Sequence, residues 1–104
     1  MDLNVINEGN SCHIDVRGEM TISTAAELMR GLAPSLVLFD DIEINLAGVN
    51  EIDSAGLQLM MAAKREATAR SKCLRFVDQS RAVVDVLNLC DLAGYFAPAM
   101  SPAC

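Results

Sequence analysis

The chain has 104 residues, which suits a single domain, and 52% of them are hydrophobic. That apolar fraction argues against a disordered protein, because the chain can bury enough surface to offset the entropy it loses on folding. The net charge of −6, from 14 acidic and 8 basic side chains, argues against a nucleic-acid binder, which needs a basic face. It also argues against docking on anionic lipid headgroups.

The first half of the chain alternates between strand and helix patterns. A short strand is predicted around 3–6, joined by a turn to a strand at 12–16 (CHIDV), where apolar and polar side chains alternate. A helix is predicted next, because Thr24 and Glu27 fit a capping box and an apolar face follows at three- and four-residue spacing. A glycine and then Pro34 are expected to weaken or end this helix.

The second half of the chain continues the alternation. The stretch 41–49 (DIEINLAGV) has the pattern of a half-buried strand, and a helix is predicted from about Ser54 to Arg70. The run 73–77 (CLRFV) is a further strand, and Ser80 is suited to cap a last helix. The order strand, strand, helix, strand, helix, strand, helix predicts an α/β fold, a mixed sheet packed by helices.

We expect one domain over residues 1–104, because no repeat, linker or charge run divides the chain. Its core is predicted to span about 3–95, and 96–104 is expected to form a loose C-terminal tail that contains two prolines and Cys104. The N-terminus lacks the features of a signal peptide, and the aliphatic runs fall far short of the roughly 20 residues of a membrane span. A cytoplasmic protein without membrane insertion is therefore expected.

The four cysteines and the single histidine, His13, lack the spacing of a zinc site. No two cysteines form a CxxC pair, and the predicted strand that holds His13 offers no second nitrogen ligand. We therefore predict no metal site, and we expect free cysteines that serve mostly as small apolar residues.

Three hypotheses fit the serine of the EIDSAG loop, which precedes the predicted helix at a sheet edge where such folds carry function. Asp53 or Ser54 can cap the helix, because both side chains accept backbone N–H bonds. A hydrolase nucleophile is disfavoured, because His13 lies in a predicted strand and the GxSxG pattern is missing. Phosphorylation of Ser54 is the third, since a charge of about −1.5 to −2 there would repel a docked partner.

The residues after Ser54 suggest a contact surface. Gly56 would let another backbone approach closely, because it has no side chain. The helix beyond is apolar almost all round at its start, so one face must cover the sheet while the remainder can form a methionine-rich docking surface.

The whole pattern resembles the STAS domain, the family of bacterial anti-sigma factor antagonists that also occurs at the tail of sulfate transporters. The resemblance covers about 3–95 and rests on three segments: VRGEMTISTAAEL, EINLAGVNEIDSAGLQLM and LRFVDQSRAVVDVLNL. It implies a sheet covered by helices on one side. It also implies a non-enzymatic interaction protein without a cofactor of its own.

In the antagonist branch of that family, the serine of a D-S-[AS]-G loop is phosphorylated by an anti-sigma factor that is also a kinase. The unphosphorylated protein binds this kinase and frees a sigma factor, and the phosphate breaks the complex. Ser54 matches the serine, so the resemblance implies phosphorylation at Ser54 and partner switching. The predicted partner-binding residues are Thr21, Asp53, Ala55, Gly56, Leu57 and Met61.

One position departs from the phosphorylated antagonists, which usually read G-E-[LIV]-D where this chain has a run that ends in Thr21. The run G-E-x-T-I-x-T-A-A-E-L is similar to small STAS proteins associated with chemotaxis kinases. It is also similar to STAS subunits of lipid-transport ABC complexes, which carry threonine at the serine position. The alternative function is therefore a non-phosphorylated adaptor subunit of a chemosensory or lipid-transport complex.

Overall fold

The computed structural model describes residues 2–96 and confirms the expected order of strands and helices. Four strands form one mixed sheet in the order β1-β2-β3-β4, and three helices accompany it. The elements are β1 (Asp2–Glu8), β2 (Ser11–Met20), α1 (Ala25–Leu38), β3 (Asp41–Ile52), α2 (Ser54–Ala69), β4 (Cys73–Val77) and α3 (Arg81–Leu89).

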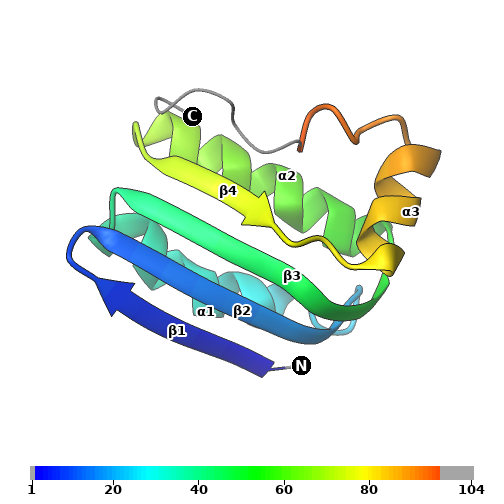
Figure 1. Cartoon of the computed structure of the whole chain (residues 1–104), viewed down its shortest axis with the longest axis horizontal. Coiled ribbons are helices and arrows are strands. Elements are labelled where there is room, and N and C mark those ends of the chain that lie inside the picture. The colour runs from blue at the N-terminus through cyan, green and yellow to red at the C-terminus, as the bar shows by residue number, and fades with distance from the viewer. Residues whose placement is uncertain (1, 97–104) are drawn as a thin grey trace.

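The sheet combines one antiparallel pair with two parallel pairs. β1 is an outer strand that pairs with β2 through a tight turn, whereas β2 with β3 and β3 with β4 run parallel. Parallel neighbours need a crossover, and α1 and α2 supply the two crossovers. The C-terminal ends of β2, β3 and β4 therefore lie at one edge of the sheet (Figure 1). The loops β2–α1 and β3–α2 meet at that edge.

The two faces of the sheet differ in cover. α1 and α2 lie side by side against one face, behind the sheet in Figure 1, and α3 lies at the end where β3 and β4 finish. In β2, β3 and β4 the side chains alternate along most of each strand between the core beneath these helices and the opposite face. The core side chains of β2, β3 and β4 are Cys12, Ile14, Val16, Met20, Ile42, Ile44, Leu46, Val49, Ile52, Leu74 and Phe76. The opposite face of the sheet carries polar side chains such as Asp15 and Asn45.

The pairing of β2 with β3 is irregular at two places. Asp15 lies opposite Asn45, but Arg17 lies opposite Gly48, so β3 contains one more residue than β2 over this stretch. A second shift follows between Gly18 and the next residue. Extra residues of this kind are β-bulges, which bend a strand and disrupt the ladder locally.

α1 differs from the sequence prediction at both ends. The capping box is not formed: the Thr24 hydroxyl donates to the Glu19 carbonyl at 2.8 Å and accepts from the Thr21 N–H at 3.0 Å. Pro34 does not end the helix, which continues to Leu38. Proline removes one helical hydrogen bond, but Leu36 in the next turn is buried, and burial of one such side chain stabilises by about 1.5 to 3 kcal/mol.

The core reaches further toward the C-terminus than predicted. The tail was expected to begin at Phe96, yet this side chain is only 1% exposed and meets the Phe76 ring edge-on, with centroids 5.6 Å apart. Residues 97–104, including Cys104, lie outside the described part of the chain. Within residues 2–96, no helix is both long and apolar enough to pass through a bilayer.

Candidate functional site

The site begins with Asp53, which joins the two loops at the edge of the sheet. It is the N-cap of α2, and one carboxylate oxygen accepts the backbone N–H groups of Ala55 at 2.9 Å and Gly56 at 3.1 Å. The other oxygen accepts the N–H of Ile22, at 3.0 Å, from the β2–α1 loop. A single carboxylate therefore satisfies donors of a helix terminus and of a second loop.

These hydrogen bonds favour the ionised form of the Asp53 side chain. The N–H of Ile22 is the main cause that lowers the pKa of Asp53 below its ordinary value, and the N–H groups of Gly56 and Ala55 lower it further. Some desolvation acts in the opposite direction without overcoming them. A carboxylate whose pKa is lower in the folded state stabilises the fold above its unfolded pKa, and this contribution is lost as the pH falls through the lowered pKa.

We predict that Asp53→Asn changes the acid dependence of stability. The variant keeps an oxygen that can cap α2 but loses the charge, so it should be less stable than wild type at neutral pH. As the pH falls through the lowered pKa of Asp53, the difference should shrink, because wild type then carries a neutral side chain too. Urea unfolding across an acid series measures this. Asp53→Ala, which also loses the cap, should be less stable than Asp53→Asn at neutral pH, and a pH-independent difference between wild type and Asp53→Asn contradicts the assignment.

Gly56 allows α2 to begin against the end of β2. A Cβ built on Gly56 would lie 2.1 Å from the Met20 carbonyl oxygen, which is a backbone atom. The same carbonyl accepts the N–H of Asp53 at 3.2 Å. The predicted close approach of a backbone to Gly56 is therefore present within the chain itself, between the two loops.

Ser54 is the first residue of α2, and its side chain is exposed. The capping role belongs to Asp53, because that carboxylate takes the N–H groups of Ala55 and Gly56. Within residues 2–96, the Ser54 hydroxyl has no hydrogen-bond partner. The structure thus separates two roles that the sequence left open and leaves the hydroxyl accessible.

The remaining predicted contact residues divide by exposure. Thr21 lies in the adjacent loop but is 8% exposed, and its carbonyl accepts the N–H of Ala25 at 2.8 Å. Leu57 is 8% exposed and belongs to the core, whereas Ala55 and Met61 are half-buried. Thr21 and Leu57 therefore pack beneath the surface of the site, and they offer little exposed area to a partner.

Sequence reasoning missed Ile22, the residue that follows Thr21. Its side chain is 80% exposed, although its N–H is fixed by the Asp53 carboxylate. A large aliphatic side chain is therefore held at the surface beside the start of α2. The sequence signal was an isoleucine between polar residues in a loop, outside the apolar pattern of any predicted strand or helix.

The single histidine of the chain lies away from the Ser54 site. His13 lies in β2, seven residues or roughly 23 Å of strand from Met20 at the site edge, and its ring pairs with Glu43 at 3.4 Å. Within residues 2–96, no three histidine, cysteine or acidic side chains gather as metal ligands. Cys12 is free and buried, as expected for a small apolar residue, whereas Cys90 is free but exposed. The expectation of free cysteines is wrong for Cys73, which is disulfide-bonded.

Comparison with known proteins identifies this architecture. A family model described as "Mlab, STAS domain" matches residues 3–100, nearly the whole chain. The chain belongs to the STAS domain family. No curated protein matches this STAS domain in sequence. The resemblance of the three sequence segments to that family is thereby confirmed.

Solved structures share the fold of this STAS domain. An anti-sigma factor antagonist from Mycobacterium paratuberculosis superposes with a TM-score of 0.80 at 20% identity, over 98% of this chain and 89% of that chain. The Bacillus cell fate determinant SpoIIAA in its phosphorylated form gives a TM-score of 0.71 at 16% identity, over 96% of this chain and 93% of that chain. At these identities the likeness establishes the fold, a mixed sheet with helices on one side.

Proposed function

We propose that this STAS domain is a non-enzymatic, cytoplasmic partner-switching protein of the anti-sigma factor antagonist kind. It binds a serine kinase of the anti-sigma type while Ser54 is unmodified, and phosphorylation of Ser54 ends that complex. The observation that carries the proposal is the exposed Ser54 hydroxyl, free of any capping role, at the start of α2. The fold shared with anti-sigma factor antagonists supports it. ATP would be bound by the kinase, so the domain needs no cofactor.

The charges around Ser54 give the switch a physical basis. A phosphate adds a charge of about −1.5 to −2, next to the Asp53 carboxylate and the exposed side chains of Glu19 and Glu51 in the same two strand ends. The N–H groups of Ala55 and Gly56 are already taken by Asp53, so the phosphate gains little from the helix terminus. The phosphate charge therefore faces a docked partner. Repulsion from acidic side chains of that partner, or the cost of desolvating the phosphate against an apolar surface, opens the interface.

Ile22 is the apolar contact of the proposed docking surface. Its 80% exposed side chain stands in the loop that Asp53 holds against the start of α2. An apolar side chain beside an exposed hydroxyl offers a partner both buried area and a phosphorylation-sensitive centre. The half-buried Ala55 and Met61 extend this surface, while Asp53, Gly56, Thr21 and Leu57 position it.

The experiment is a pull-down from lysate of the native source, with tagged wild type beside Ser54→Asp and Ser54→Ala. Wild type and Ser54→Ala should capture a kinase with an ATP-binding domain, and Ser54→Asp should lose most of it. Ser71→Asp is the matched control, because Ser71 is exposed just past the opposite end of α2 and receives the same added charge. With the captured kinase and labelled ATP, wild type should accept phosphate and Ser54→Ala should not.

Equal capture by wild type and Ser54→Asp would contradict the switch. If the shared partners were then components of a transporter or a receptor array, the domain would be a constitutive adaptor. Loss of binding in Ser71→Asp as well would show that added charge anywhere on the domain disrupts the complex.

A further inference from the structure

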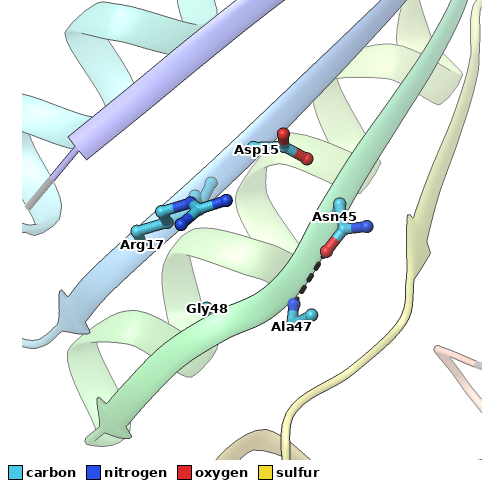
Figure 2. A pocket seen from close by; sticks show the side chains of 6 residues that line it. Asp15, Arg17, Asn45, Ala47 and Gly48 are labelled. Atoms are coloured by element: carbon cyan, nitrogen blue, oxygen red, sulfur yellow. Dashed lines mark hydrogen bonds between the residues drawn. The ribbon is translucent and has the colours of Figure 1, made fainter.

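The open face of the sheet contains a polar hollow that is separate from the Ser54 site. Its volume is about 350 Å³, within the range of about 300 to 1,000 Å³ typical of small-molecule sites. Figure 2 shows the side chains around it, on β2 and β3. The lining residues are Asp15, Val16, Arg17, Asn45, Ala47 and Gly48.

The bulge in β3 builds one wall of this hollow. Asn45 lies opposite Asp15, and the extra residue in β3 follows directly after it. The Asn45 side-chain oxygen accepts the N–H of Ala47 at 2.8 Å, and its amide nitrogen donates to Asp78 at 2.9 Å. Both ends of the Asn45 amide are therefore fixed, which leaves its orientation settled before any ligand arrives.

Gly48 makes room for the Arg17 side chain. A Cβ at Gly48 would lie 2.7 Å from the Arg17 Cγ and 3.2 Å from its Cβ. The aliphatic stem of Arg17 therefore lies directly against the backbone of β3. Figure 2 shows the guanidinium on the same side of the strands as the side chains of Asp15 and Asn45, around the hollow.

Asp15 and Arg17 bring opposite charges to the hollow without neutralising each other. They are two residues apart in β2, so their Cα atoms are about 7 Å apart on one face of the strand. Within residues 2–96, neither side chain forms a hydrogen bond or an ion pair. Arg75, on the same face, is instead paired with Asp41 at 3.1 Å and Glu43 at 3.4 Å.

We propose that this hollow binds a small zwitterion, namely an α-amino acid. The Arg17 guanidinium donates to the ligand carboxylate, and the Asp15 carboxylate accepts from the ligand ammonium group. A plain anion is repelled by Asp15 and a plain cation by Arg17, so the pair selects a molecule that carries both charges. The Asn45 oxygen retains a lone pair and can accept a further hydrogen bond from the ammonium group.

The test is a titration of the ¹⁵N-labelled domain followed by amide chemical shifts. The probes are pools of the standard α-amino acids, with acetate and methylammonium as single-charge controls. At least one pool should give saturable shifts at Arg17, Ala47 and Gly48, and the responsible amino acid is then titrated alone. Arg17→Gln and Asp15→Asn should each weaken its binding at least about tenfold, because each loses a charge-assisted hydrogen bond. Arg81→Gln in α3, an exposed position paired with Asp85, should not change it.

Three outcomes overturn the proposal. The first is the absence of saturable shifts with every pool. The second is acetate or methylammonium binding as tightly as the amino acid, which would mean that one charge suffices. The third is binding that neither Arg17→Gln nor Asp15→Asn weakens, in variants whose spectra show the native fold. None of these results bears on Ser54, so the partner-switching proposal is tested separately.

Discussion

Replacing Gly56 by alanine is expected to lower the free energy of unfolding by about 2 to 3 kcal/mol, as for other overpacked sites. The added methyl group would lie 2.1 Å from the Met20 carbonyl oxygen, and a backbone atom at the end of a strand has little freedom to retreat. Separation of the two would also break the hydrogen bond from the Asp53 N–H to that carbonyl. Urea unfolding followed by circular dichroism measures the loss.

Gly31→Ala is the matched control for this substitution. Gly31 also lies inside a helix, but its added Cβ would meet the side-chain end of Leu3, at 2.3 Å from Cδ1, and that group can rotate away. Alanine favours a helix by about 1 kcal/mol over glycine, so Gly31→Ala should be neutral or stabilising. If Gly56→Ala were as stable as Gly31→Ala, the close packing of α2 on the end of β2 would be wrong.

Phe96→Ala is expected to destabilise the fold by about 3 to 5 kcal/mol, the usual cost of removing a buried phenylalanine side chain. The ring is 1% exposed and makes edge contacts with Phe76 at 5.6 Å and Tyr95 at 4.7 Å between centroids. Its carbonyl also accepts from the Gln79 side chain at 3.2 Å, a bond that the substitution leaves in place. The effect measured by urea unfolding is therefore chiefly that of the ring.

Leu89→Ala is the comparison for Phe96→Ala, because Leu89 is 86% exposed near the same end of the chain. Its removal should change stability by no more than about 0.5 kcal/mol. An equally small effect of Phe96→Ala would mean that the ring contributes nothing to the core and that the domain ends before it.

The order of elements could be predicted because each depends on a local pattern. β4 occupies the residues predicted for it, since CLRFV alternates cleanly between two turns. The predictions for the two ends of α1 failed because contacts outside the helical pattern decide them. Thr24 had the sequence of a capping box, but its hydroxyl is used by Glu19 at the end of β2. Pro34 is tolerated because Leu36, two residues later, is buried. The stabilisation from that burial cannot be judged from the spacing of apolar residues alone.

The same limit applies to the functional loop. Asp53 and Ser54 are equally good caps in sequence, and the structure assigns the role to Asp53, whose other oxygen binds Ile22, 31 residues away. A loop that far away cannot be read from the pattern around Ser54. The exposure of Ile22 escaped prediction for that reason, as did the burial of Thr21.

The outer position of β1 affects whether copies of the domain can associate through their sheets. An unpaired strand edge with the exposed side chains of Val5 and Ile6 is a template for adding a further strand. If two copies met antiparallel about Val5, Asp2 of each would lie opposite Glu8 of the other. Like charges placed opposite one another disfavour such a pair. Asp2 and Glu8 therefore oppose self-association through the unpaired side of β1.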